Sequence, residues 1–149
     1  MLLDTDIVSA FLKRDAQKRT PTLFAFVTAV LAAEGLAVSY VTQFELRRGM
    51  EELGRRGQGR SKLVNFEKFM ERVQVLGLDA ASGEGWNLAS RLWADGRCLK
   101  PARVFTDADL LNASTAAFHG QEFATSDVGL AEGLGLLAFP VAVRLVAME

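Results

Sequence analysis

The sequence predicts an α/β fold in which a central parallel sheet of about five short strands is sandwiched between helices. Short apolar runs alternate with segments of helical periodicity along the whole chain. The 149 residues are 50% apolar and 23% charged. This composition predicts a folded chain with a hydrophobic core, not a disordered one. Since no linker divides the chain, we expect a single domain over residues 1–149.

The first elements are a strand at Met1–Leu3, a helix over Ile7–Lys13 and a long apolar helix over 21–34. Thr20 and Pro21 mark the start of the long helix, because threonine caps helix N-termini and proline suits the first helical position. Gly35 marks its end. The apolar stretch Leu23–Ala33 is shorter than the roughly 20 residues of a membrane span, so we expect no membrane segment.

The middle of the chain is predicted to hold two strands that flank two helices. In chain order these are strand Leu36–Val41, helix Thr42–Leu53, helix Ser61–Arg72 and strand Val73–Leu76. Three glycines between Gly54 and Gly59 separate the two helices and predict a loop. Ser61 is the expected N-cap of the second helix.

The last part of the chain is predicted to alternate in the same way. Its elements are helix Ser82–Gly96, helix Thr106–His119, strand Glu122–Thr125, helix Val128–Gly133 and strand Gly135–Phe139. Trp86 and Trp93 lie seven residues apart on one helical side, and we expect them in the core or at a subunit interface.

Acidic residues follow several of the predicted strands or open the helices after them. In open parallel sheets the carboxyl ends of the strands form the ligand-binding edge, so these acids are expected to meet there. Carboxylates that meet repel one another, and a cation relieves that repulsion. The acids are Asp4, Asp6, Glu45, Asp107, Asp109 and Asp127.

An all-oxygen ligand set of this kind suits Mg²⁺ or Mn²⁺. The single cysteine, Cys98, excludes a multi-cysteine zinc site and a disulfide framework and fits a reducing, cytoplasmic setting. Each acid also has a purely structural explanation. Thr42-x-x-Glu45 and Thr106-x-x-Asp109 both match a capping box, and Asp4 or Asp6 would serve as a cap of the first helix.

Four segments in this order resemble the PIN-domain proteins, in particular the VapC-type toxins of bacterial toxin–antitoxin pairs. They are LLDTDIVSAFL, SYVTQFELRRG, TDADLLNASTAAFHG and FATSDVGL, and they span nearly the whole chain. The resemblance implies a single PIN-like nuclease domain that hydrolyses RNA phosphodiester bonds with Mg²⁺ or Mn²⁺. It also implies a homodimer, or a higher toxin–antitoxin assembly, neutralised by a small antitoxin protein.

Residue by residue, the resemblance matches Asp4, Glu45, Asp109 and Asp127 to the four acids of the family's catalytic site. Asp4 and Asp109 are the expected direct metal ligands, with Glu45 and Asp127 completing the cluster. A hydroxyl near the site would come from neighbouring side chains, Thr125 or Ser126. Asp6 stands where the family commonly has asparagine, and Asp107 is a nearby second candidate to Asp109.

Charge is unevenly distributed behind the net value of −1. Residues 47–72 carry +4, whereas residues 104–149 carry −5. The basic segment either binds RNA phosphates or is a solvated helical face of mixed charge. Its candidate phosphate-binding residues are Arg47, Arg48, Arg55 and Arg56.

Two other functions remain open from the sequence. Asp4-x-Asp6 after an apolar strand also resembles the opening of haloacid-dehalogenase-type phosphatases, in which the first aspartate is a nucleophile and the second a general acid. The chain could instead be a non-catalytic binding module whose acids only cap helices. His119 has no partner motif, so we expect it to be a helix-end residue without a catalytic role.

Overall fold

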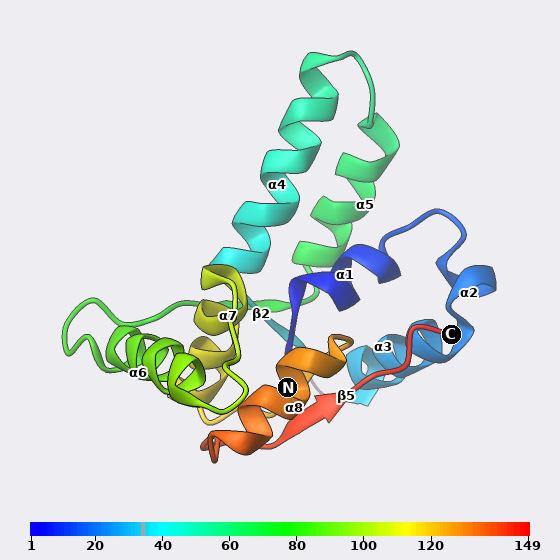
Figure 1. Ribbon diagram of the computed structural model, residues 1–149. Coiled ribbons are helices and arrows are strands. Elements are labelled where there is room, and N and C mark those ends of the chain that lie inside the picture. The colour runs from blue at the N-terminus through cyan, green and yellow to red at the C-terminus, as the bar shows by residue number, and fades with distance from the viewer. Residues whose placement is uncertain (34) are drawn as a thin grey trace.

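Five parallel strands form one sheet, in the order β3-β2-β1-β4-β5 (Figure 1). The structure is a computed structural model and describes residues 1–33 and 35–149. The strands are β1 (Leu2–Leu3), β2 (Ala37–Ser39), β3 (Gln74–Leu76), β4 (Phe123–Thr125) and β5 (Val143–Leu145). The predicted fold class and the number of strands are therefore confirmed.

Helices cover both faces of this sheet. They are α1 (Thr5–Phe11), α2 (Ala16–Arg19), α3 (Pro21–Ala33), α4 (Tyr40–Arg55), α5 (Arg60–Met70), α6 (Glu84–Cys98), α7 (Asp107–Phe118) and α8 (Val128–Leu136). Figure 1 shows α6, α7 and α8 on one side of the sheet and α1, α2 and α3 on the other. The helix predicted to reach Glu34 is described as far as Ala33, and Glu34 lies outside the described residues.

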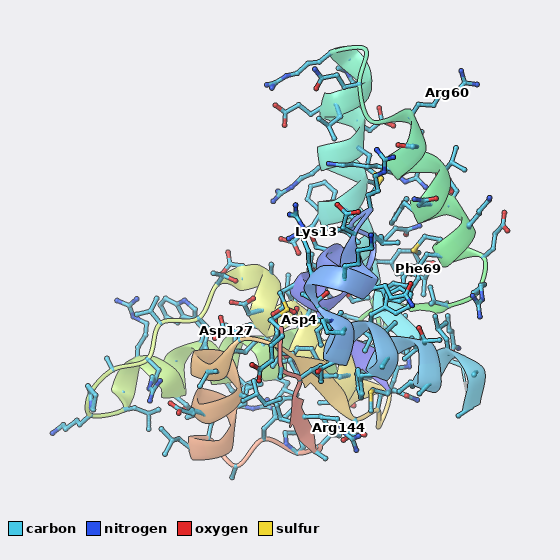
Figure 2. All side chains as sticks on the ribbon, turned by 90° about the vertical axis from the view of Figure 1, so that its right-hand side faces the viewer. Asp4, Lys13, Arg60, Phe69, Asp127 and Arg144 are labelled. Atoms are coloured by element: carbon cyan, nitrogen blue, oxygen red, sulfur yellow. The ribbon has the colours of Figure 1, made fainter. Side chains whose placement is uncertain are left out.

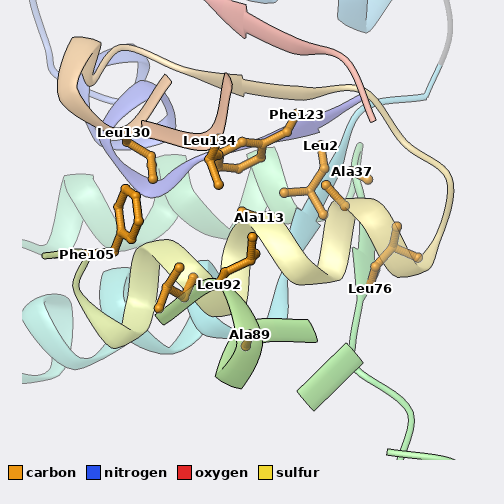
Figure 3. Close-up of a cluster of buried hydrophobic side chains, with 12 residues drawn as sticks. Leu2, Ala37, Leu76, Ala89, Leu92, Phe105, Ala113, Phe123, Leu130 and Leu134 are labelled. Atoms are coloured by element: carbon orange, nitrogen blue, oxygen red, sulfur yellow. The ribbon is translucent and has the colours of Figure 1, made fainter. Parts of the chain in front are cut away.

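Two apolar cores lie on opposite faces of the sheet, because successive side chains of a strand point to opposite sides. Leu2 and Phe123 pack with α6, α7 and α8, as Figure 3 shows. The next residues along the same strands, Leu3 and Ala124, pack instead with α1 and α3. Each of these four side chains is 0% exposed. Apolar strands buried on both faces are what a parallel sheet covered by helices requires.

The long helix α4 begins earlier than the sequence predicted. Its N-cap is Ser39, whose hydroxyl accepts a hydrogen bond of 2.9 Å from the backbone N–H of Thr42. The structural alternative for Glu45, a capping box with Thr42, is therefore wrong. Because the helix starts at Tyr40, Glu45 lies in its second turn and is not a capping residue.

The predicted start of α3 is confirmed, because Pro21 is its first residue and the carbonyl of Thr20 accepts from the backbone N–H of Phe24 at 2.9 Å. The Thr20 hydroxyl itself donates to the carbonyl of Ala16, in the short helix α2 that the sequence did not predict. The predicted cap of α5 is wrong, because Gly59, and not Ser61, precedes its first residue. Gly59 has φ of +79°, and a Cβ there would lie 2.8 Å from the Leu53 side chain, so glycine is required at this turn.

The helices α4 and α5 form a hairpin that projects from the rest of the molecule (Figure 1). The predicted glycine loop is shorter than expected, because α4 continues through Gly54 to Arg55. The base of the hairpin is held to the body by Phe69, which is buried and packs 5.9 Å from the Phe11 ring.

The predicted last strand at Gly135–Phe139 is wrong. Residues up to Leu136 belong to α8, and the backbone N–H of Leu137 donates to the Gly133 carbonyl at 3.2 Å to close the helix. The strand that pairs with β4 is β5, at Val143–Leu145. Its residues are half-buried or exposed, so it lacks the buried apolar run that identifies β1, β2 and β4.

In the part of the chain that the structure describes, no helix is both long enough and apolar enough to cross a membrane. Trp86 and Trp93 are half exposed on α6, so the prediction that they fill the core is wrong. The other prediction, that they lie at a subunit interface, stays a prediction.

The close approach of α8 to Phe105 gives a stability prediction. A Cβ on Gly133 would lie 2.6 Å from the Phe105 ring, whereas a Cβ on Gly135 meets no atom within 4 Å. We expect Gly133→Ala to lower the free energy of unfolding by about 1–3 kcal/mol through overpacking. Gly135→Ala in the same helix should leave it unchanged or raise it by up to about 1 kcal/mol. Urea denaturation compares the two, and equal effects would contradict the packing shown here.

Candidate active site

Five acidic side chains line one cavity at the carboxyl edge of the sheet. The cavity has a volume of about 320 Å³, and its acids are Asp4, Asp6, Glu45, Asp109 and Asp127. Thr5, Ser9, Thr106 and Ala108 complete its lining. Figure 2 shows Asp4 and Asp127 close to each other, although they are far apart in the sequence. The structure therefore brings together all four acids that the sequence singled out first.

The chain topology explains why these acids meet. Asp4 directly follows β1 and caps α1, while Asp127 follows β4 and caps α8. Glu45 is carried by the helix that follows β2. Asp109 lies in the first turn of α7, whose N-cap Thr106 accepts a hydrogen bond of 3.1 Å from its backbone N–H. The carboxyl ends of neighbouring parallel strands thus deliver side chains from four segments to one point.

Asp107 does not share this cavity. It lines a different one, of about 500 Å³, together with Trp86 and Trp93 of α6. Two residues apart in the first turn of a helix, Asp107 and Asp109 point in different directions, and the structure places Asp109 at the candidate site.

Asp4 is the most buried acid of the site, with 3% of its surface exposed. Its Oδ1 accepts hydrogen bonds from the backbone N–H of Thr5 at 2.8 Å and from Nδ2 of Asn112 at 2.9 Å. Its Oδ2 accepts one from the Thr125 hydroxyl, also at 2.8 Å. These three donors come from α1, α7 and β4, so one carboxylate joins three segments of the fold.

Burial is the main cause that raises the pKa of the Asp4 carboxyl from 3.8 to about 7, and the nearby charge of Asp6 acts in the same direction. The hydrogen bonds from Thr125, Thr5 and Asn112 lower this pKa and oppose the shift only in part. A carboxylate whose charge is disfavoured in this way is suited to a cation, which would offset the cost of its burial.

Asn112 links Asp4 to the second strand and its helix. Its Oδ1 accepts hydrogen bonds from the hydroxyls of Ser39 and, at 3.3 Å, Thr42, while its Nδ2 also donates to Thr5 Oγ1 at 3.3 Å. The residue is 1% exposed. Sequence reasoning missed it, although one signal was present: a polar amide within an otherwise small and apolar helix, one turn after Asp109.

Thr5 connects Asp4 with Glu45 and was also missed. Its hydroxyl donates to Glu45 Oε2 at 2.6 Å and lies 2.9 Å from the Thr42 hydroxyl. The other carboxylate oxygen of Glu45 lies 3.8 Å from the guanidinium of Arg48. Glu45 is thus held in place at the cavity by a neighbour of Asp4.

Asp6 has a positioning role in the structure. Its carboxylate accepts from the backbone N–H of Ile7 at 2.6 Å and from both the backbone N–H, at 3.1 Å, and the hydroxyl of Ser126. It therefore ties the turn after β4 to α1. The hydroxyls of Thr125 and Ser126, predicted to lie near the site, act through Asp4 and Asp6.

Asp127 and Asp109 differ in how their carboxylates are engaged. Asp127 Oδ1 accepts from the backbone N–H of Leu130 at 2.9 Å, as a helix cap does. The Asp109 carboxylate makes no hydrogen bond or ion pair with any residue that the structure describes. Of the acids in the cavity, Asp109 is therefore the one whose carboxylate is free to bind a ligand.

The donors of the cavity are all oxygens, which suits a hard divalent cation. Among residues 1–33 and 35–149, no three acidic, histidine or cysteine side chains stand close enough to enclose a metal ion. Mg²⁺ is compatible with this spacing, because it retains several waters and needs only one or two carboxylates. Asp4, which is buried, and Asp109, whose carboxylate is free, are the pair of acids best suited to bind the cation.

The four arginines predicted to bind phosphate are all engaged in ion pairs. Arg47 pairs with Glu67 and Arg55 with Glu51, each at 3.0 Å, and Arg56 pairs with Glu52. Arg48 pairs with Glu45 of the cavity at 3.8 Å. Arg55 lies ten residues after Glu45 on α4, about 15 Å farther along the helix axis, so the far end of the hairpin is remote from the acids.

His119 and Cys98 lie outside the site. His119 ends α7 and its Nε2 lies 2.8 Å from the carbonyl oxygen of Gly77, which gives it a structural contact. Cys98 is exposed at the end of α6. Asp6, the general acid of the phosphatase alternative, lines the cavity and accepts hydrogen bonds from Ile7 and Ser126.

The buried carboxyl of Asp4 gives a pH-dependent stability prediction. In the absence of metal, the Asp4 carboxyl stays protonated up to a pH of about 7 in the folded chain, but only up to 3.8 in the unfolded chain. The free energy of unfolding should therefore fall as the pH rises through this window and level off above it. Asp4→Asn should remove the effect and stabilise the protein at pH 8 by about 1–4 kcal/mol, but not at pH 4.

Thermal unfolding in EDTA at the two pH values measures this difference, with Asp107→Asn as a control outside the cavity. A shift of the midpoint that is the same at pH 4 and pH 8 would show that Asp4 has an ordinary pKa.

Comparison with known proteins identifies the fold. A family model described as the PIN domain matches residues 1–133. Similar solved structures include VapBC2 from Rickettsia felis bound to a DNA fragment from their promoter, with a TM-score of 0.69 and 18% identity over 98% of both chains. VapBC-1 from nontypeable Haemophilus influenzae gives a TM-score of 0.67 and 19% identity, covering 97% of this chain and 96% of that chain.

FitAcB from Neisseria gonorrhoeae gives a TM-score of 0.65 and 22% identity, covering 96% of this chain and 95% of that chain. None of the curated proteins compared by sequence matches the chain. The family model, which spans most of the chain, agrees with the resemblance carried by the four sequence segments. The chain belongs to the PIN-domain family, whose members are nucleases.

Proposed function

We propose that this protein is a Mg²⁺- or Mn²⁺-dependent endoribonuclease and the toxin of a toxin–antitoxin pair, with residues 1–149 acting as its single nuclease domain. The observation that carries the proposal is the acid-lined cavity, in which Asp4 is buried and Asp109 has a free carboxylate. Such a cavity repels a phosphodiester unless a cation is bound in it, so a metal-dependent reaction on a phosphate ester is the chemistry that it supports best.

In this proposal Asp4 and Asp109 hold the metal, and Glu45 and Asp127 complete the cluster through water, since no three acids of the described residues stand close enough to enclose the ion directly. When bound, the metal neutralises the phosphodiester charge and lowers the pKa of the attacking water. Asn112 and Thr125 hold the Asp4 carboxylate in one orientation. Thr5 orients Glu45, which is thereby placed to accept a proton from a water in the cavity.

The different directions of Asp109 and Asp107 provide a matched test. Asp109→Asn removes the free carboxylate from the cavity, and we expect it to lower both Mg²⁺ affinity and the rate of RNA cleavage at least about 100-fold. Asp107→Asn makes the same chemical change two residues away, outside the cavity, and should leave both within about threefold.

Calorimetric titration with Mg²⁺ or Mn²⁺ and cleavage of a labelled RNA measure the two effects. If the two variants lose activity equally, or if Asp109→Asn binds metal like the wild type, the site proposed here is wrong. Release of phosphate from small esters, without cleavage of RNA, would favour the phosphatase alternative.

An antitoxin partner is supported by the similar solved structures, which are named as VapBC and FitAcB proteins. The acidic cavity is also suited to a basic side chain, because a cation of a partner would neutralise carboxylates that a metal otherwise binds. We therefore propose that a small antitoxin inhibits the enzyme by placing a basic residue among these acids. An RNA substrate and a lone exposed cysteine both fit a cytoplasmic protein.

A homodimer is supported by an exposed apolar surface beside the active site. We call it the aromatic patch, and it consists of Tyr40, Phe44, Trp86, Trp93 and Leu111. The four aromatic side chains are between 45% and 61% exposed. They line two adjoining cavities that share Leu111. Contiguous exposed aromatic surface of this kind marks an interaction site.

The charges around the aromatic patch favour a second copy as its occupant. Arg48 lies over the Phe44 ring at 5.3 Å and Arg97 over the Trp93 ring at 4.8 Å, while Asp107 lies beside the same tryptophans. A surface that carries both signs of charge is able to pair with itself across a two-fold axis, as isologous interfaces do.

We expect the double variant Phe44→Ser/Trp93→Ser to be monomeric and folded, because both side chains are half exposed and contribute little to the core. Leu136→Ser, which changes a side chain that is 62% exposed on α8, should remain dimeric. Sedimentation equilibrium distinguishes the two states. A wild-type monomer, or a double variant that still dimerises, would contradict this assignment.

A further inference from the structure

A group of exposed cations follows α1 on the chain. We call it the basic corner, and it consists of Lys13, Arg14, Lys18 and Arg19. Asp15 is the one acid within this stretch, so residues 13–19 carry a charge of +3. Within the described residues, none of the four cations forms an ion pair.

The basic corner begins where α1 ends, and the last turn of α1 separates it from the acidic cavity. Ser9 is exposed and lines the cavity together with Asp6. Leu12 is the C-cap of α1, and the next residue, Lys13, donates from its backbone N–H to the Ala10 carbonyl at 3.2 Å. Four residues separate Ser9 from Lys13, a rise of about 6 Å in a helix, so the basic corner starts about one turn from the rim of the cavity.

Further cations lie across the contact that holds the hairpin to the body. Figure 2 shows Lys13 and Phe69 on the same side of the molecule. Phe69 packs on Phe11, two residues before Lys13. The exposed Lys68 and Arg72 lie near Phe69 in the sequence but alternate with the exposed Glu67 and Glu71, so this segment adds cations without adding net charge.

The basic corner differs in an essential way from the arginines that the sequence singled out. Each of those four arginines is already paired with a glutamate. A phosphate that binds one of them must displace a carboxylate or approach it closely, and the repulsion opposes binding. The basic corner carries four cations without ion-pair partners among the described residues and one acid, Asp15, in the same stretch, so the electrostatic gain on binding a phosphate is larger. Glu149, whose carbonyl accepts from the backbone N–H of Thr22 at 3.0 Å, is a further acid near the end of this stretch.

We propose that the basic corner binds the phosphates of a single-stranded RNA as the strand leaves the acidic cavity along α1. The inference rests on the proposed ribonuclease function and adds to it the path of the substrate on one side of the site. Binding of this kind is independent of base sequence, and its affinity falls steeply with salt. The logarithm of the binding constant falls with the logarithm of the salt concentration, with a slope of about 0.7 for each phosphate contacted in a single strand.

The test measures binding of a fluorescently labelled single-stranded RNA of mixed sequence by anisotropy, in EDTA so that no cleavage occurs, over a range of salt concentrations. The variants are Lys13→Ala/Arg14→Ala and Lys18→Ala/Arg19→Ala. The matched control is Arg55→Ala/Arg56→Ala, which also removes two exposed cations. Thermal unfolding confirms that all three are folded.

We expect each basic-corner variant to bind RNA about tenfold more weakly at low salt and to reduce the salt slope by about 1.4, since two phosphate contacts are lost. The control should stay within about twofold of the wild type. Equal losses in the control, or unchanged binding in both basic-corner variants, would overturn the inference.

Two further readouts distinguish a failure of the basic corner from a failure of the ribonuclease function. If the wild type cleaves RNA with Mg²⁺ while the basic-corner variants bind RNA normally, the inference fails and the ribonuclease function stands. If the wild type neither binds nor cleaves RNA, the proposed function itself fails. If the variants lose binding of a synthetic polyglutamate peptide but retain RNA binding, the surface recognises an acidic protein segment and the RNA assignment is wrong.

Discussion

The burial of the Asp4 carboxylate is the constraint on which the rest of this structure depends. The carboxylate follows a two-residue strand at the centre of the sheet and is bound by Thr5, Asn112 and Thr125. These donors fix the relative positions of α1, α7 and β4. Asn112 and Thr5 then extend the same network to Ser39, Thr42 and Glu45. One hydrogen-bonded group thereby orients two of the five carboxylates of the site, those of Asp4 and Glu45.

This arrangement has an electrostatic cost that is tied to its function. Asp4 is buried beside Asp6, and the pKa of its carboxyl is raised to about 7. A site made only for stability would replace such a group by an apolar one. Retaining the acid makes sense if a cation occupies the cavity during catalysis, because the charge that destabilises the metal-free protein then becomes a binding determinant. In the proposed function, Asp109 with its free carboxylate would be the second residue that binds this cation.

Much of the fold and the acids of the site could be predicted because they rest on local patterns. Buried strands leave apolar runs, and the acids at their ends are visible in the sequence. The misplaced elements depend on contacts between distant residues: β5 is recognisable only by its pairing with β4, and Gly59 is required because Leu53 packs against it. Asn112 and Thr5 were missed for the same reason, since their roles arise from partners on other elements. The charge pattern identified basic segments, but only the structure separates paired arginines from unpaired ones.

The most direct test of the central claim is the pKa of the Asp4 carboxyl, followed by NMR of its side-chain carbon with and without Mg²⁺. We expect a pKa of about 7 in the metal-free protein. Saturating Mg²⁺ should lower it below its usual value near 3.8, because the bound cation favours the ionised form. A metal-free pKa near 3.8 that Mg²⁺ does not change would contradict both the burial of the carboxylate and its proposed role in binding the metal.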